Sequence, residues 1–156
     1  MAQTATDLPP AATTEIAVAL NQAVAETVVA TMLAQNFHWN VTGMSFGPLH
    51  ALFQEIYEDH FLGQDDLAER IRALGETAEG KLATHLERSK VTEGDEHATD
   101  KEMIRHLMEA QETIGATLAG VGALAAQHGD VRTEDLAIER GRAHDKFAWM
   151  LRAHLR

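Results

Sequence analysis

An apolar ridge near the start of the chain constrains the fold more than any other sequence feature. Its members recur at every fourth position: Ile16, Leu20, Val24, Val28 and Met32. Side chains four positions apart lie on the same face of a helix. The ridge therefore predicts a long helix that Thr13 or Thr14 can cap and that runs to about Asn40, with Gly43 available for the following turn.

The rest of the chain carries signals for three more long helices. A second is expected over residues 48–74, because a proline suits its first turn and a glycine follows its end. Thr99 and Glu102 form a capping box that opens a third helix, which ends near residues 127–129. Thr133, with acidic residues in the first turn after it, opens a fourth.

The connection between the second and third helices is long and polar, over residues 76–98, and residues 81–90 within it can form a short helix. Such a connection crosses a bundle from one end to the other. We therefore predict an all-α, ferritin-like four-helix bundle with a short helix in the long central crossover. Residues 1–13 are expected to be a flexible arm and residues 14–156 one domain.

Composition narrows the class of function. The chain has no cysteine, which excludes disulfides and thiolate sites and fits a reducing cytoplasm. Its net charge is −11, and residues 1–69 carry no Lys or Arg. Such a chain attracts cations and repels DNA phosphates. With no signal peptide and no apolar run approaching the length of a bilayer span, we expect no membrane partner.

Four side chains between residues 38 and 69 are of the types that hold a divalent metal. His38 and His50 are twelve residues apart, and Asp65 and Glu69 share a helical face at i and i+4. Imidazole and carboxylate suit iron, zinc or manganese. A solvated acidic face is the simpler interpretation of the carboxylates taken alone.

Helix geometry prevents these four residues from meeting within one chain. If residues 48–74 form one helix, His50 and Asp65 are about 22 Å apart along its axis, whereas ligands of one metal lie within about 2–2.6 Å of it. Either these are two unrelated half-sites, or two antiparallel copies of the helix complete the site across a two-fold interface. The Glu-x-x-His motif of intrachain di-iron bundles is missing from the sequence, which favours the interface.

Two signatures resemble those of the Dps family, the DNA-protecting mini-ferritins of starved bacteria. His38-Trp39-Asn40-Val41-Thr42-Gly43, followed by Leu49-His50, resembles the first signature. Asp65-Asp66-Leu67-Ala68-Glu69-Arg70, followed by Leu74-Gly75, resembles the second. The helix pattern matches over nearly the whole chain, including the closing Asp145-Lys146-Phe147-Ala148-Trp149 segment.

The resemblance implies a hollow homo-dodecamer with ferroxidase sites at its two-fold interfaces. His38 and His50 come from one subunit and Asp65 and Glu69 from its partner. Iron as Fe(II) is oxidised there, preferably by hydrogen peroxide, and stored as ferric mineral, which protects the cell from oxidative damage. One position departs from the family: Gln54 stands where a carboxylate is usual, so two irons are expected, the second bound more weakly.

The resemblance also implies acidic pores through which iron enters. The pore candidates lie near the start of the last helix: Asp130, Glu134, Asp135 and Glu139. Acids at a helix start are equally ordinary caps. We do not expect DNA binding through residues 1–15, which carry no Lys or Arg. The alternative to a ferroxidase is a non-catalytic, metal-sequestering or DNA-associated protective shell.

Overall fold

The computed structural model describes residues 7–156, and five helices make up its regular structure. Their bounds are α1 (Pro10–Asn40), α2 (Phe46–Ala73), α3 (Leu82–Arg88), α4 (Asp100–Gln127) and α5 (Val131–Ala153). No strand occurs in this range. The prediction of four long helices with a short one in the crossover is confirmed.

Three helices begin earlier than the sequence predicts, and for α2 the difference is only two residues, Phe46 instead of residue 48. Pro9 caps α1 and Pro10 is its first residue, because proline lacks only an N–H that the first turn leaves unpaired anyway. Leu8 is buried as well, so residues 8–13 are not part of a flexible arm; residues 1–6 of the predicted arm lie outside the described residues. Asp130, rather than Thr133, caps α5 by accepting a hydrogen bond from the backbone N–H of Thr133.

The predicted capping box of α4 is confirmed. The Thr99 hydroxyl accepts from the N–H of Glu102 (3.3 Å), and the Glu102 carboxylate accepts from the N–H of Thr99 (2.7 Å). Gly75 follows α2 with φ of 86°, a left-handed conformation that glycine adopts without strain. These local signals fixed the helix ends without help from tertiary contacts.

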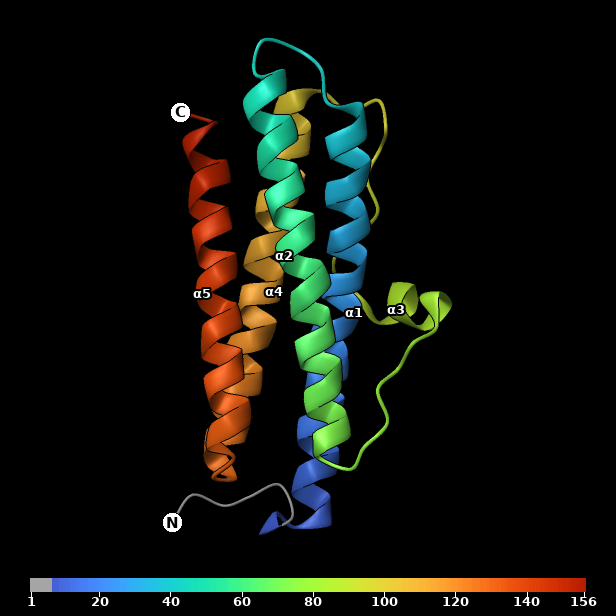
Figure 1. Cartoon of the computed structure of the whole chain (residues 1–156), viewed down its shortest axis with the longest axis vertical. Helices are drawn as coiled ribbons and strands as arrows, with labels where there is room; N and C mark the ends of the chain where they lie inside the picture. Colours follow the sequence, from blue (N-terminus) through green and yellow to red (C-terminus); the bar gives the residue numbers. More distant parts are fainter. Residues whose placement is uncertain (1–6) are drawn as a thin grey trace.

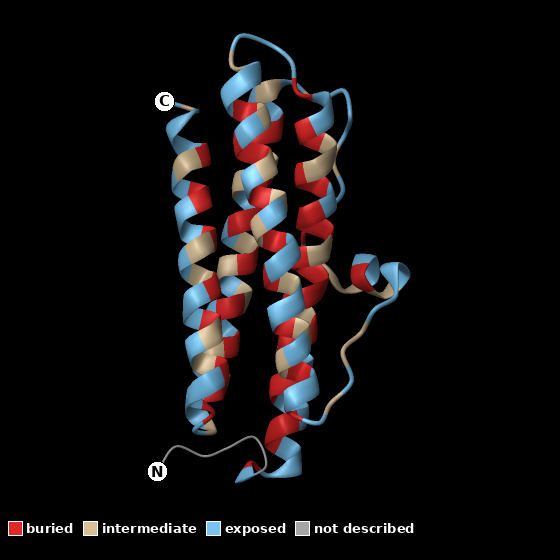
Figure 2. Cartoon of the chain, viewed as in Figure 1, coloured by how far each residue is buried: buried red, intermediate tan, exposed pale blue. Residues whose placement is uncertain are grey.

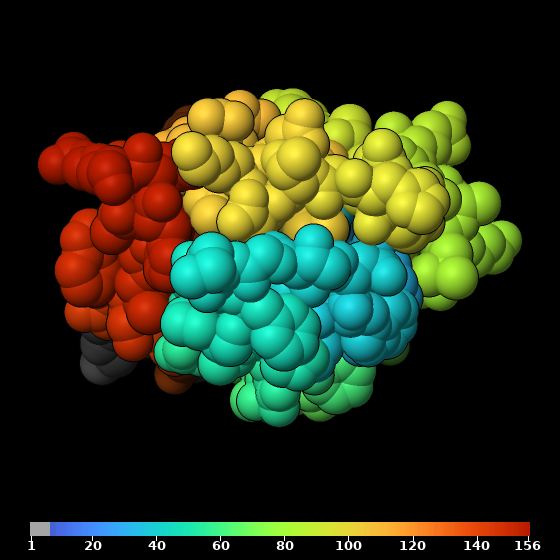
Figure 3. All heavy atoms as spheres, turned by 90° about the horizontal axis from the view of Figure 1, so that it is seen from above, coloured from blue at the N-terminus to red at the C-terminus, as the bar shows by residue number. Residues whose placement is uncertain are grey.

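The long crossover sets the topology. Helices α1 and α2 run antiparallel, the crossover then returns along the outside of α1 with α3 in it, and α4 and α5 form the second antiparallel pair (Figure 1). The turn between α1 and α2, the start of α4 and the C-terminus lie at the same end of the bundle (Figure 3). The histidine at the end of α1 and that at the start of α2 are therefore brought to one end.

Buried residues recur along all four long helices (Figure 2). The ridge of α1 is buried at Ile16, Leu20 and Val24, whereas Met32 is 55% exposed. A four-residue step advances about 40° beyond a full turn. Over the sixteen residues from Ile16 to Met32 the ridge rotates by about 160° and leaves the core, so Met32 is not a core residue.

Helix α1 is also long and apolar enough to cross a membrane by length and composition, with a mean hydropathy of 1.6 over its best 18-residue window. The expectation that no apolar run approaches that length is therefore wrong for this helix. Within the bundle, however, 72% of that window is buried. The apolar residues of α1 are thus accounted for by the packing of the core.

Candidate metal centre

His38 and His50 meet where α1 ends and α2 begins. Their rings stack with centroids 3.7 Å apart and planes 15° from parallel. Two reciprocal hydrogen bonds hold them: Nδ1 of His38 lies 2.7 Å from the backbone oxygen of His50, and Nδ1 of His50 lies 2.7 Å from that of His38. The short turn between the helices thus locks two imidazoles that are twelve residues apart in the sequence.

These bonds determine which ring nitrogens are free. A backbone carbonyl only accepts, so each Nδ1 must carry the hydrogen and donate it. In a neutral ring the lone pair then resides on Nε2. Metal-bound histidines in proteins have this arrangement, in which the second N–H is donated to a carbonyl or carboxylate. The pair therefore presents two lone pairs, already oriented, for a metal ion.

Aromatic neighbours support the pair from both sides. Tyr57 meets His38 edge-on at 5.3 Å between centroids, and Phe46 stacks on His50 at 5.1 Å. His38 is buried while His50 is only half-buried. Trp39, adjacent to His38 in the chain, is 63% exposed. The stacked pair thus extends from the buried side of the bundle at His38 to its partly exposed side at His50.

Asp65 and Glu69 lie on the exposed surface of α2. Within residues 7–156, neither carboxylate has a hydrogen bond or ion pair to another side chain. Since α2 is one continuous helix, Asp65 is about 22 Å from His50 along its axis. In the described part of the chain, no three His, Asp or Glu side chains are grouped closely enough to hold a metal ion. Within one subunit the predicted ligands therefore lie in two separate groups, His38 with His50 and Asp65 with Glu69, which we call half-sites.

The half-sites nevertheless share one face of α2. At 100° per residue, Gln54, Asp65 and Glu69 lie about 40°, 60° and 100° around the helix from His50. Gln54 is half-buried, and its amide nitrogen donates a hydrogen bond to Oε1 of Glu58 at 2.8 Å. Glu58 lies on the same face, about 80° from His50. Glu58 was not singled out in the sequence, because no histidine or acidic residue four positions away pairs with it.

Of the four pore candidates, Asp130 has a structural role in this chain. It is 2% exposed, its carboxylate accepts from Arg70 at 2.9 Å, and it also accepts a short hydrogen bond from the Thr133 hydroxyl. Within the subunit it is an ion-paired helix cap. The others remain at the surface: Glu134 is half-buried, and Asp135 and Glu139 are exposed.

A second polar cluster, missed in the sequence, lies inside the bundle between α2, α4 and α5. The amide oxygen of Gln111 lies 2.9 Å from Nε2 of His60 and 2.8 Å from Nδ1 of His144. Nδ1 of His60 lies 3.0 Å from the Asp59 carboxylate, which also accepts two hydrogen bonds from Arg140, at 2.7 and 3.1 Å. No sequence spacing relates the whole set, because Asp59 and His60 lie on α2, Gln111 on α4, and Arg140 and His144 on α5.

Burial controls the protonation of this cluster. Loss of hydration lowers the pKa of His60, and it lowers the pKa of His144 well below its ordinary value. Burial by itself raises the pKa of Asp59, but the hydrogen bonds from His60 and Arg140 outweigh it and hold this pKa below its usual range. The cluster is thus a carboxylate–guanidinium pair beside two histidines that resist protonation.

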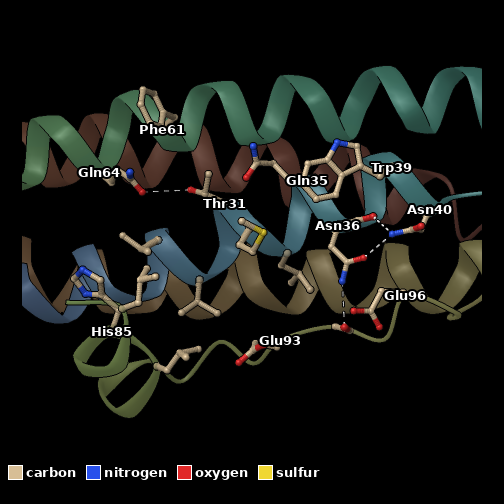
Figure 4. Close-up of a pocket in the computed structure, with 17 residues that line it drawn as sticks. Thr31, Gln35, Asn36, Trp39, Asn40, Phe61, Gln64, His85, Glu93 and Glu96 are labelled. Carbon is tan, nitrogen blue, oxygen red and sulfur yellow. Dashed lines mark hydrogen bonds between the residues drawn. The ribbon is translucent and has the colours of Figure 1, made fainter. Parts of the chain in front are cut away.

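A groove of about 600 Å³ runs beside the half-sites, between α1, α2 and the crossover. Trp39 of α1, Phe61 of α2 and His85 of α3 stand around it (Figure 4). Large apolar side chains in its wall are exposed: Met32, Trp39, Phe61, Leu82 and Leu86. An adjoining hollow of about 350 Å³ is lined by Asp65 among others. The two hollows therefore form one largely apolar face, to which Trp39 and Asp65 contribute, beside the candidate ligands.

Comparison with known proteins shows which family shares this architecture. The model of the ferritin-like domain matches residues 17–156. Over 136 residues the chain is 34% identical to DNA protection during starvation protein 2 of Bacillus anthracis, covering 87% of this chain and 93% of that protein. It is 34% identical over 142 residues to the DNA protection during starvation protein of Brevibacillus brevis, covering 90% and 94%.

Solved structures agree. The Dps protein of Vibrio cholerae O1, described as a member of a broad superfamily of ferritin-like diiron-carboxylate proteins, superposes with a TM-score of 0.93 at 30% identity, covering 100% of this chain and 98% of that one. Dps from Staphylococcus aureus gives 0.89 at 34% identity, covering 92% and 96%. The chain belongs to the Dps family of ferritin-like proteins.

Proposed function

We propose that the protein is a ferroxidase and iron store of the cytoplasm. It oxidises Fe(II), preferably with hydrogen peroxide, at sites shared between subunits, and keeps the ferric product as mineral in a hollow dodecamer. The reaction removes Fe(II) and hydrogen peroxide, the two reactants that together generate oxidative damage. Membership of the ferritin-like Dps family supports iron storage and protection in general; the oxidant, the ligands and the assembly are the content of the proposal.

The observation that carries the proposal is the locked His38–His50 pair. Both Nδ1 atoms are committed to backbone carbonyls, so both Nε2 lone pairs are directed away from the turn that holds them. A histidine pair with a purely structural role would have no need to leave the Nε2 atom of each ring without a hydrogen-bond partner. Imidazole nitrogen binds Fe(II) and tolerates Fe(III), which a centre that cycles between them requires.

A second copy of the chain supplies the carboxylates. If His50 faces the partner subunit's Asp65 and Glu69 on an antiparallel α2, the two-fold axis passes halfway between these positions, near Glu58. Phe61 lies next to that point on the same face and is 63% exposed, as expected for a residue that an interface covers. Two equivalent sites result, one on each side of the axis.

The buried face of the crossover gives a second sign of a missing neighbour. His85 lines both hollows and is only 4% exposed. Its Nδ1 is buried, and no residue in the described range 7–156 hydrogen-bonds it. A buried polar atom normally has a partner, and a subunit packed against this face can bring one.

The ligand set fits the reaction. Glu69 can bridge two irons, while Asp65 and the histidines hold one of them. Each Fe(II) gives up one electron; hydrogen peroxide takes up two electrons and two protons, its O–O bond breaks, and two water molecules form. The carboxylates offset the charge of the ferric product, which then leaves for the cavity.

Protection of DNA by this chain does not require binding it. The net charge is −11, and the last seventeen residues, with five Lys or Arg and one acid, are the only mildly basic end. Phosphate contacts dominate affinity for nucleic acid, so we expect no retention in a gel shift at physiological salt. Retention of DNA at that salt concentration would show that the protein also protects DNA by binding it.

Asp65→Ala tests the catalytic part, with Asp66→Ala as the matched control. Both residues are exposed neighbours on α2, but they point in different directions. Apoprotein is mixed anaerobically with Fe(II) and then with peroxide, and oxidation is followed by absorbance. Fast oxidation should be lost in Asp65→Ala and kept in Asp66→Ala, with both shells intact by size exclusion. Equal rates in the two variants would identify a non-catalytic shell instead.

A further inference from the structure

Gln54 occupies the position where the family resemblance expects a carboxylate ligand, and the structure gives it a partner. Its Nε2 donates to Oε1 of Glu58 at 2.8 Å, one helical turn further along α2. Gln54 is half-buried and Glu58 is exposed. The bond is directed along the face of the helix that also carries His50 and Asp65.

This bond fixes the orientation of the amide. A carboxylate only accepts hydrogen bonds, so the NH₂ end of Gln54 must face Glu58. The amide oxygen, with its two lone pairs, then faces away from Glu58. Without such a partner a glutamine can present either end to its surroundings. An NH₂ group cannot ligate a cation, whereas an amide oxygen is a neutral oxygen ligand.

Distance shows that Glu58 acts through Gln54 and not as a ligand beside His50. Eight residues separate His50 from Glu58, which is about 12 Å along the helix axis. A metal held by an imidazole nitrogen lies about 2.0–2.1 Å from it, beyond the reach of that carboxylate. Gln54 is one turn, about 6 Å, from His50, which is the spacing of side chains that meet on one face.

We propose that Glu58 is a positioning residue that turns the amide oxygen of Gln54 toward the second iron position. Glu58 also polarises the amide, because a charged acceptor at the N–H end increases the negative charge on the oxygen. The Glu58–Gln54 pair thus replaces one carboxylate ligand by an amide ligand with a carboxylate behind it, as carboxylates do behind metal-bound histidines. The inference rests on the shared metal site proposed above.

The consequence is a site of lower charge. With neutral imidazoles, Asp65 and Glu69 give it a formal charge of −2, and a carboxylate at position 54 would make it −3. The second iron is therefore held by a polarised dipole rather than by a full charge. We expect two binding events of unequal affinity, with the weaker one dependent on Glu58.

Anaerobic titration of the assembled apoprotein with Fe(II), followed by calorimetry, tests this. Glu58→Ala should weaken the second event about tenfold, since loss of an outer partner costs about 10–100-fold in metal affinity, and should leave the first unchanged. Glu55→Ala is the matched control: it removes an exposed carboxylate on the same helix turn that projects about 100° from Gln54, and should leave both events unchanged.

A double variant separates positioning from simple charge. In a Gln54→Asp background the ligand no longer needs orienting, so adding Glu58→Ala should not weaken the second event. Equal weakening in both backgrounds would overturn the proposal, because Glu58 would then act only through its charge. A Glu58→Ala protein with an unchanged second event, or a native protein with a single event, would also overturn it.

Two further measurements keep the outcome interpretable. Glu58→Gln preserves side-chain size near the two-fold axis and replaces Glu58→Ala if that variant does not assemble; its amide no longer forces one orientation, so an intermediate weakening is expected. Asp65→Ala should abolish the first event. If it does not, the shared site itself is wrong, which is a different failure from that of Glu58.

Discussion

Two pairs of histidines in this bundle show how differently the same side chain can be used. His38 and His50 stack at the surface, and each gives its Nδ1 to a backbone carbonyl of the other. His60 and His144, with ring centroids 4.6 Å apart and tilted by 49°, share the amide of Gln111 in the core. The first pair has free Nε2 atoms at the surface; the second has its polar atoms enclosed.

The difference lies in the partners and not in the rings. A backbone carbonyl fixes one nitrogen and leaves the other available, so the surface pair is prepared for a ligand from outside. Side-chain partners on three helices instead make the buried pair a link between α2, α4 and α5. The Asp59–Arg140 ion pair extends that link across α2 and α5. We therefore expect changes in the first pair to affect iron and changes in the second to affect stability.

The largest expected effect is on iron oxidation in His50→Ala. Removing a direct ligand should cost more than removing an outer partner, for which about 10–100-fold is typical, so fast oxidation should fall by more than about 100-fold. Thermal unfolding should change little, because His50 is half-buried and its ring bonds only the backbone of His38. Stopped-flow absorbance with Fe(II) and peroxide measures the rate; a variant with an undiminished rate would remove the distinction between the pairs.

The converse change is Gln111→Leu in the core. It leaves Nε2 of His60 and Nδ1 of His144 without a partner, while His60 keeps its bond to Asp59, and an unsatisfied buried group costs about 1–3 kcal/mol. A loss of about 3 kcal/mol corresponds to about 10 °C in the unfolding temperature. Gln127→Leu at the exposed end of α4 is the control for calorimetry. The first Fe(II) binding event should survive, and its loss together with stability would show that the two pairs are coupled.

Acid should weaken the buried pair. Burial lowers the pKa of His60 and His144 in the folded state below the ordinary 6.5. Below that pH the unfolded chain binds protons that the folded one does not, so stability falls as the pH decreases. Each histidine contributes at most about 1.4 kcal/mol per pH unit. Unfolding temperatures between pH 7.5 and 5.5 should fall less steeply in His144→Ala than in the native protein, and an identical slope would contradict the assignment.

The smallest effect concerns the glycine that admits Arg140. A Cβ on Gly63 would lie 2.5 Å from Cζ of Arg140, whereas one on Gly120 of α4 meets nothing within 4 Å. Alanine in place of a helical glycine stabilises by about 1 kcal/mol. Gly120→Ala should show this gain in denaturant unfolding. Gly63→Ala should not, because the guanidinium must move off Asp59; equal gains in both would show that Arg140 adjusts at no cost.

Much of the fold could be predicted because its signals are local. The Thr99–Glu102 box, Pro48 near the start of α2 and Gly75 act through hydrogen bonds and dihedral angles within one turn of the chain. The errors were also local. Pro9 and Asp130, rather than the predicted threonines, occupy the N-cap positions of α1 and α5. Met32 lies outside the core because the apolar ridge rotates around α1. In the site, His38, His50, Asp65 and Glu69 could be proposed because two signatures name them. The ion pair of Asp130 with Arg70 could not be predicted, because the two residues are 60 positions apart in the sequence.

The sequence by itself determined the helices, the family and the impossibility of a complete site within one continuous α2, since these follow from residue types, spacing and the rise of a helix. Only the tertiary structure decided how side chains from different helices are oriented: the reciprocal bonds of the two imidazoles where α1 meets α2, and the histidine link in the core. Each depends on distances between side chains and hydrogen-bond partners that the pattern of residue types does not specify, because orientation is fixed only when helices pack.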